Sequence, residues 1–194
     1  MNIKIDLYLI ITLAILAIVR QVEAFLIFYL FIVLHELIHI VTALVLKIKI
    51  NEITFLPFGV NAKFDFNNHR IKEILVAMAG PLFSLGIALT IEKFMYQNIF
   101  IFITNMLPIY PLDGGRILKN IIVQILGVKR GIKIYDNILK VVIINLIIIN
   151  ILLIIFLKNY NFIFVSLYIL QLAWEEIKQD KLRAHISSLL NMEF

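Results

Sequence analysis

The chain has 194 residues, of which 62% are apolar or aromatic and only 16% are charged, with a net charge of +5. A soluble domain of this size cannot bury so many apolar side chains, because its surface is large relative to its volume. Disordered chains are poor in such residues. The mean hydropathy of +0.98 therefore predicts an all-α protein that crosses a membrane about six times. Cysteine is absent, so His, Asp or Glu must hold any metal.

Six apolar runs have about the length that a helix needs to cross roughly 30 Å of hydrocarbon. We expect these spans at residues 3–19, 24–46, 74–91, 98–113, 138–157 and 162–174. No small-residue cleavage site follows the first run, so we interpret it as a retained span. Six spans place both termini on the same side of the membrane. Of the basic residues, only Arg20, Lys93 and Lys158 lie in the loops on the opposite side. Basic residues gather in the cytoplasm, so we predict a multi-pass cell-membrane protein with both termini cytoplasmic.

Two segments outside the predicted spans have patterns of their own. Residues 50–66 partly alternate apolar and polar, with Pro57 and Gly59 at the centre, which fits either a β-hairpin or a connecting loop. Residues 175–194 could form an amphipathic helix at the membrane surface, and their spacing of Leu and Ile also fits ordinary packing. This tail is too short for another soluble domain, so we expect residues 1–174 to form one membrane domain.

The second apolar run contains His35-Glu36-Leu37-Ile38-His39, which matches the pattern H-E-x-x-H. Residues four apart share one face of a helix, so both imidazoles can bind one Zn²⁺. Glu36 is adjacent and can act as a general base toward water. A chance match is the alternative. However, an unpaired ionisable side chain inside a membrane span costs about 2.5 kcal/mol or more, which favours a metal site.

Catalytic zinc takes three protein ligands, so the two histidines leave one ligand to be found. Asp113 ends the fourth apolar run, among residues that disturb helices: Pro108, Pro111, Gly114 and Gly115. We expect the helix to unwind there and to aim Asp113 at a neighbouring span. A surface Asp in a β-turn is the alternative. His69 and His185 would be ligands only if a loop folded back.

The chain resembles the site-2 protease family of intramembrane zinc metalloproteases, peptidase family M50, in two motifs. One is HELIH in the second predicted span, and the other is N-x-x-P-x-x-P-L-D-G, which starts at Asn105 in a later span. Ala79-Gly80-Pro81 matches a third motif of this family, and Ser84 stands where many members have Asn. The short form without a PDZ domain and the segment Leu56-Pro57-Phe58-Gly59 are most similar to the stage IV sporulation protease FB branch. Members of that branch often carry a C-terminal CBS domain, for which this chain is too short.

The resemblance implies that Asp113 is the third zinc ligand of a metalloendopeptidase that cuts a membrane-associated protein near the cytoplasmic face. The branch implies that the substrate is an inactive pro-sigma factor, processed during sporulation in the mother-cell membrane around the forespore. It also implies membrane-protein inhibitors or regulators, and no nucleic acid. An anti-sigma factor or a signal-peptide remnant is an alternative substrate.

Four residues are candidates for substrate binding. The loop at Pro57, Phe58 and Gly59 could hold an unwound substrate by strand addition. Asn105 could hydrogen-bond the substrate backbone or tie two helices together.

Two functions of other classes would also use these residues. A catalytically silent membrane scaffold would keep the fold, but the intact H-E-x-x-H motif with Glu36 argues against it. A metal transporter would line its path with His and Asp. Transporters more often show inverted repeats and charges in several spans, whereas the ionisable groups here converge on one site.

Overall fold

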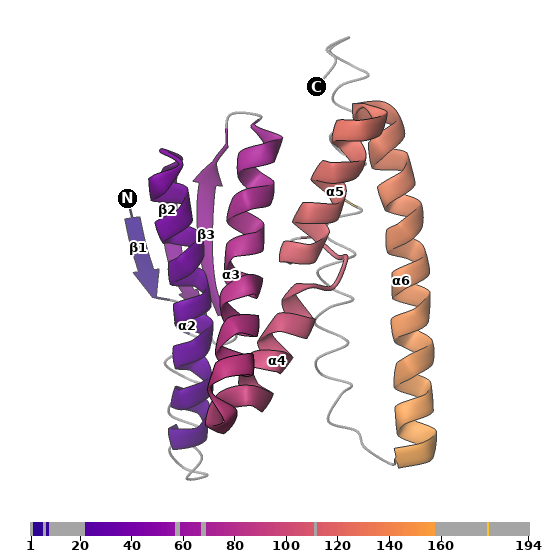
Figure 1. Ribbon diagram of the computed structural model, residues 1–194. Helices are drawn as coiled ribbons and strands as arrows, with labels where there is room; N and C mark the ends of the chain where they lie inside the picture. Colours follow the sequence, from indigo (N-terminus) through magenta and orange to yellow (C-terminus); the bar gives the residue numbers. More distant parts are fainter. Residues whose placement is uncertain are drawn as a thin grey trace. The chain divides into compact units, whose positions relative to one another are not determined.

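The computed structural model describes residues 2–5, 7, 22–56, 59–66, 69–110, 112–157 and 178. The chain divides into two compact units, Met1–Met106 and Leu107–Phe194. Most of the expected span at residues 3–19, all of the one at 162–174, and nearly all of the tail lie outside the described residues. The described part is mostly helical, with one small sheet (Figure 1).

Within its described residues, the first unit has three helices, a 3₁₀ turn and three strands. In chain order they are β1 (Asn2–Ile5), α2 (Val22–Val45), β2 (Lys49–Leu56), β3 (Gly59–Asp65), α3 (Arg70–Thr90), the 3₁₀ turn η1 (Glu92–Phe94) and α4 (Met95–Asn105). The second unit holds α5 (Asp113–Leu126) and α6 (Val128–Leu157).

Among the described residues, α2 and α3 contain the helical segments that are long and apolar enough to cross a membrane, Phe25–Val45 and Arg70–Thr90. They lie where the sequence predicts the second and third spans. Large apolar side chains are exposed along both helices, while two histidines and a serine are buried. The exposed ones include Leu26, Leu30, Leu37, Val41 and Leu44 on α2, and Ile71, Leu75, Met78, Leu82 and Leu89 on α3. Apolar side chains outside and polar ones inside suit a protein surrounded by lipid.

Of the two interpretations of residues 50–66, the structure supports the β-hairpin, because β2 and β3 pair antiparallel. A third strand was not expected: β1 pairs parallel with β2, with Ile3 opposite Ile53, so the strand order is β1-β2-β3. This corrects the prediction that the first apolar run is helical from residue 3. Residues 2–5 alternate polar and apolar, which suits a strand, but their partner strand lies far along the chain.

The sheet packs on one face of α2. Ile53 and Ala62 are buried among Val33 and Ile40 of that helix. At 3.6 residues per turn, Val33 and Ile40 point to the side of α2 opposite His35 and His39. The sheet therefore covers one face of α2 and leaves the histidine face to another element.

The end of α2 is closed by a Schellman motif. The Ile48 N–H donates to the Ala43 carbonyl at 2.8 Å, and the Lys47 N–H donates to the Leu44 carbonyl at 3.0 Å. Lys47 has a φ of 56°, the left-handed conformation that this motif requires and that usually falls to glycine. The Lys72 ammonium donates to another carbonyl of this helix end at 3.1 Å.

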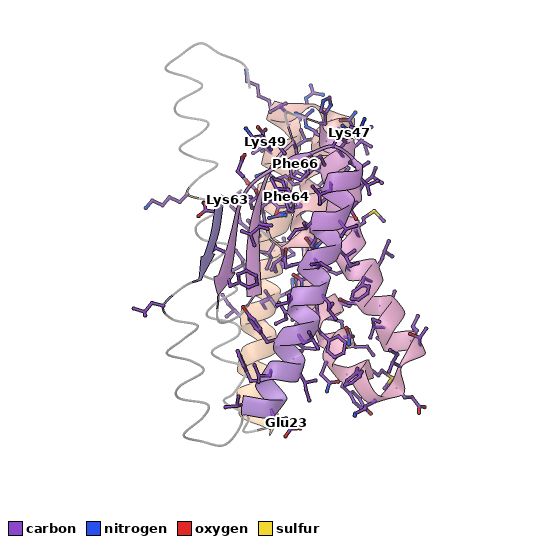
Figure 2. All side chains as sticks on the ribbon, turned by 90° about the vertical axis from the view of Figure 1, so that its left-hand side faces the viewer. Glu23, Lys47, Lys49, Lys63, Phe64 and Phe66 are labelled. Atoms are coloured by element: carbon purple, nitrogen blue, oxygen red, sulfur yellow. The ribbon has the colours of Figure 1, made fainter. Side chains whose placement is uncertain are left out.

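Basic residues lie near one end of α2, and an acidic residue lies at the other. Figure 2 shows Lys47 and Lys49 at its C-terminal end, with Phe64 and Phe66 of the hairpin region nearby, and Glu23 at the other end. The basic end is the one that the positive-inside rule assigns to the cytoplasm.

The fourth apolar run is not a single helix, which corrects the expected span at residues 98–113. α4 ends at Asn105, and the next helix begins only at Asp113. The expected unwinding before Asp113 is thus confirmed: Pro108 has no backbone donor and cannot continue the helix. An 11-residue α4 is about 16 Å long, roughly half the hydrocarbon thickness.

α5 and α6 form a helical hairpin, although the sequence predicts a loop before a span starting at residue 138. Gly127, with a φ of 77°, makes the turn between them. A Cβ on Gly131 would lie 2.7 Å from the Cα of Val123, so this glycine lets the helices approach closely. Ile109, Tyr135 and Leu139 form the fully buried core of this unit.

Candidate metal centre

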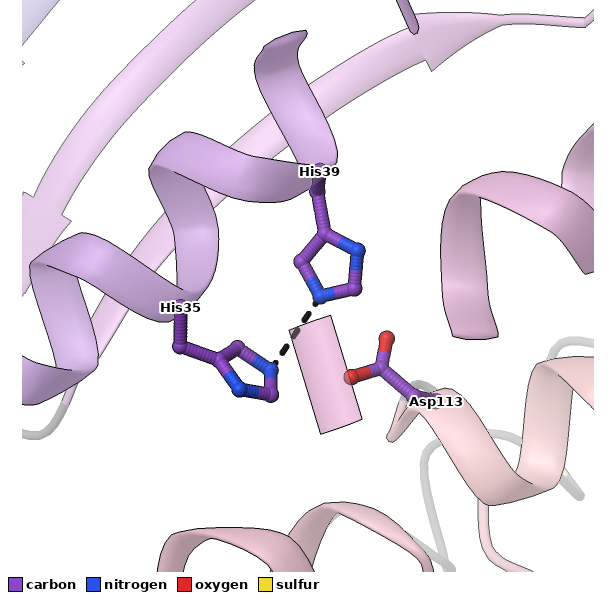
Figure 3. Close-up of side chains that lie close together, drawn as sticks. All are labelled: His35, His39 and Asp113. Atoms are coloured by element: carbon purple, nitrogen blue, oxygen red, sulfur yellow. Dashed lines mark hydrogen bonds between the residues drawn. The ribbon is translucent and has the colours of Figure 1, made fainter. Parts of the chain in front are cut away.

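α2 holds the two histidines of H-E-x-x-H on one face. His35 and His39 are only 2% and 3% exposed, and their Nε2 atoms lie 3.1 Å apart (Figure 3). In a tetrahedral site with Zn–N distances of about 2.0–2.1 Å, two ligand nitrogens are about 3.3 Å apart. The spacing of the two nitrogens therefore fits a shared zinc ion.

α3 orients both imidazole rings. His39 Nδ1 lies 2.6 Å from the Val76 carbonyl, to which it donates. His35 Nδ1 lies 2.9 Å from Ser84 Oγ. With each Nδ1 engaged on α3, both Nε2 atoms face the same point, as metal-binding histidines do when their other nitrogen is hydrogen-bonded.

Gly80 lies between these two partners, four residues from each on the same face of α3. A Cβ on Gly80 would collide with His39 Nε2 and would lie 2.6 Å from His35 Nε2. The glycine of the Ala79-Gly80-Pro81 motif therefore leaves open the space in front of both nitrogens.

Glu36 follows His35 directly on α2 and is half-buried. A carboxylate beside a metal ligand is well placed to exchange protons with a water molecule at the metal. α2 thus carries two imidazoles and one carboxylate within five consecutive residues.

Asp113 is the first residue of α5 and is 6% exposed (Figure 3). A carboxylate is favourable in the first turn of a helix, where the backbone N–H groups are unpaired. A Cβ on Gly115 would collide with the backbone of Ile109 and Tyr110, so this glycine lets α5 lie against the segment that precedes it. The expectation that Gly114 and Gly115 disturb the helix is wrong, because both lie inside α5.

A side chain of α6 holds the segment that precedes Asp113. The Tyr110 N–H donates to the hydroxyl of Tyr135 at 2.8 Å, and Tyr135 is fully buried. The backbone leading to Asp113 is therefore held by its own unit.

Of the four candidate substrate-binding residues, the structure describes two, one at the start of β3 and one at the end of α4. Gly59 begins β3, while Pro57 and Phe58 lie outside the described residues. Asn105 is the last residue of α4, and its amide donates to the Ile101 carbonyl of the same helix at 3.0 Å. Of the other histidines, His69 is exposed just before α3 and His185 lies outside the described residues.

Sequence reasoning missed the roles of Val76 and Ser84. Their spacing around Gly80 was a usable signal: residues 76, 80 and 84 follow the same four-residue step as His35 and His39. It becomes informative only once α3 is known to pack against α2.

The family model described as Peptidase family M50 matches residues 23–95 and 90–149. The chain belongs to peptidase family M50. The match includes both histidines, Glu36, the face of α3 that contacts them, and Asp113. Membership supports a zinc metalloprotease and agrees with the paired imidazoles of α2, because imidazole is a common ligand of Zn²⁺.

Individual relatives agree with this assignment. The chain is 31% identical over 114 residues to Stage IV sporulation protein FB of Bacillus subtilis, which covers 50% of this chain and 40% of that protein. It is 32% identical over 133 residues to a zinc metalloprotease of Methanocaldococcus jannaschii, which covers 60% and 39% respectively. The chain thus spans about two fifths of the length of these curated relatives.

A solved structure extends the similarity over most of the fold. The site-2 protease from Methanocaldococcus jannaschii superposes with a TM-score of 0.65 at 26% identity, covering 91% of both chains. The sequence-based resemblance to the site-2 protease family is therefore confirmed.

Proposed function

We propose that this protein is an intramembrane zinc metalloprotease. The observation that carries the proposal is the buried pair His35 and His39, with both Nδ1 atoms held by α3 and both Nε2 atoms 3.1 Å apart. In this proposal the active site lies within a six-span domain at residues 1–174, in the cell membrane, with both termini in the cytoplasm.

The proposed metal ligands are His35, His39 and Asp113. All three are buried and each offers one ligand atom. Asp113 is supported by the family membership and by its position at the start of α5, after a segment fixed by Tyr135. Zinc in such a site supplies a Lewis acid that polarises a scissile carbonyl and activates water.

Glu36 is the proposed general base. Its carboxylate takes a proton from the attacking water and delivers that proton to the leaving amine. The remaining groups of the site position the chemistry: α3 holds the imidazoles, and Gly80 keeps the space in front of them free.

The proposed substrate is a membrane-associated protein cut near the cytoplasmic face. Similarity to the sporulation protein FB supports an inactive pro-sigma factor, processed in the mother-cell membrane around the forespore under the control of membrane-protein regulators. An anti-sigma factor or a signal-peptide remnant is the alternative. The loop at Pro57, Phe58 and Gly59 and the amide of Asn105 are the proposed contacts of the unwound substrate.

The test is Glu36→Gln in purified protein incubated with a pro-sigma factor that carries its membrane-associating pro-sequence. We expect cleavage to fall by at least about 100-fold, as general acid–base groups contribute roughly 10²–10⁴-fold, while zinc content is unchanged. The matched control is Glu23→Gln, an exposed carboxylate at the other end of α2, which should cleave like the unaltered protein.

Other outcomes separate the alternatives. Retained cleavage by zinc-loaded Glu36→Gln would remove Glu36 as the base. Zinc binding without cleavage of any tested substrate class, together with zinc flux across vesicles, would favour a transporter. Absence of zinc from the unaltered protein would favour a silent scaffold.

A further inference from the structure

The two imidazoles of the metal centre have chemically different partners at Nδ1. His39 faces the Val76 carbonyl, which only accepts hydrogen bonds, so His39 carries its proton on Nδ1. His35 faces the hydroxyl of Ser84, which can donate or accept. Which ring nitrogen of His35 carries the proton therefore depends on a side chain, and that side chain can be changed without altering the backbone.

The hydroxyl of Ser84 has a different kind of hydrogen-bond partner from the threonine hydroxyls of α2, α3 and α4. Thr42, Thr90 and Thr104 each donate to the carbonyl four residues before them in their own helix, at 2.8 Å. That local bond is the common choice for a helical hydroxyl. Ser84 instead bonds across to α2, and it is fully buried.

We propose that Ser84 is a positioning residue that sets the tautomer and ring orientation of His35. Its oxygen accepts the proton on His35 Nδ1, which leaves the lone pair of Nε2 directed at the metal. This proposal rests on the proposed function, in which His35 and His39 hold zinc. Removing such a partner of a metal-binding histidine typically lowers metal affinity or activity by about 10–100-fold.

Burial makes this contact decisive. Ser84 has no exposed surface and His35 is 2% exposed, so water has no ready access to replace a lost hydroxyl. Without Ser84 Oγ, the Nδ1 proton of metal-bound His35 would be buried without its acceptor, which is unfavourable. The ring can avoid this by moving the proton to Nε2, and the nitrogen that faces the metal then has no lone pair to bind it.

The test compares Ser84→Val with Ser84→Thr, two substitutions of nearly equal shape that differ in the hydroxyl. Zinc affinity is measured by competition with a coloured chelator, and the visible spectrum of the Co²⁺-loaded protein reports ligand geometry. We expect Ser84→Val to bind zinc about 10–100-fold more weakly with an altered Co²⁺ spectrum. Ser84→Thr should stay within about threefold of the unaltered protein, since it keeps the hydroxyl acceptor.

Comparison of two variants of nearly equal volume, and a third variant with a smaller side chain, control for packing. Ser84→Val and Ser84→Thr add nearly the same volume, so any effect of packing on zinc affinity should be common to both variants. Ser84→Ala adds no volume and should also lose about 10–100-fold in zinc affinity.

The results separate this proposal from the proposed function. Equal zinc affinity in Ser84→Val and Ser84→Thr, or unaltered affinity in Ser84→Ala, would overturn the role of Ser84 while leaving the zinc site intact. Failure of the unaltered protein to bind zinc would instead overturn the proposed function.

Discussion

Gly80 faces the Nε2 atoms of both His35 and His39, where the proposed metal lies. Any side chain larger than hydrogen would enter this space, because a Cβ there would collide with one ring and lie 2.6 Å from the other. At the residue scale, the proposed metal centre therefore needs the space that glycine leaves at position 80 as well as the two histidines.

Gly80→Ala should abolish zinc binding, since its methyl group would displace the imidazoles. The matched control is Gly86→Ala on the same helix, where a Cβ meets nothing within 4 Å. This control should bind zinc normally and gain up to about 1 kcal/mol in stability from alanine's higher helix propensity. Zinc content of the two purified variants checks the prediction. Normal zinc in Gly80→Ala would show that the metal lies elsewhere.

Single residues of the site differ in how readily the sequence predicts them. His35, Glu36 and His39 lie within one turn or so of a helix, so their spacing alone predicts a shared site. Asp113 lies far along the chain, and the residues around it left a surface turn open until the family resemblance was considered. Ser84 and Gly80 act through the packing of α3 against α2, and their four-residue spacing does not show which helix they face.

At the scale of elements, the end of α2 is held in an unfavourable conformation. Lys47 adopts a left-handed backbone with a φ of 56°, which costs a residue with a Cβ about 1–2 kcal/mol. The motif is retained because Ile48 is buried against Ala43 and Val76. This closure also directs the chain into β2.

Lys47→Gly should relieve this cost and raise the unfolding free energy by roughly 1 kcal/mol. The measurement is the thermal unfolding midpoint in detergent. Lys49→Gly, two residues on and at the start of β2, is the control and should lower the midpoint, because glycine weakens a strand. A lower midpoint for Lys47→Gly would contradict this account of the cap.

The sequence predicts some elements well for identifiable reasons. α2 and α3 are long apolar runs, and the hairpin alternates around a proline and a glycine. β1 was missed because its strand partner is remote in the chain. α5 was missed because it carries Arg116 and Lys119, so a search for apolar runs assigned it to a loop. The break before Asp113 followed from Pro108, whose effect is local.

At the scale of the whole molecule, the excess of apolar residues has two consequences. It supplies the exposed apolar faces of α2 and α3, and it surrounds a few buried polar groups that need partners or a metal. Family membership shows that this arrangement belongs to a known class of peptidases. The sequence alone could exclude a soluble fold, but only the structure shows how α3 orients the histidines.

The central claim is that His35, His39 and Asp113 together hold one zinc ion. Its most direct test is the zinc content of the purified protein, compared between the unaltered chain, Asp113→Asn and the control Asp65→Asn at the end of β3. We predict one zinc per chain in the unaltered protein and in Asp65→Asn, and strongly reduced zinc in Asp113→Asn, because a neutral amide is a poor zinc ligand compared with a carboxylate. Equal zinc in all three proteins, or none in the unaltered chain, would contradict the account.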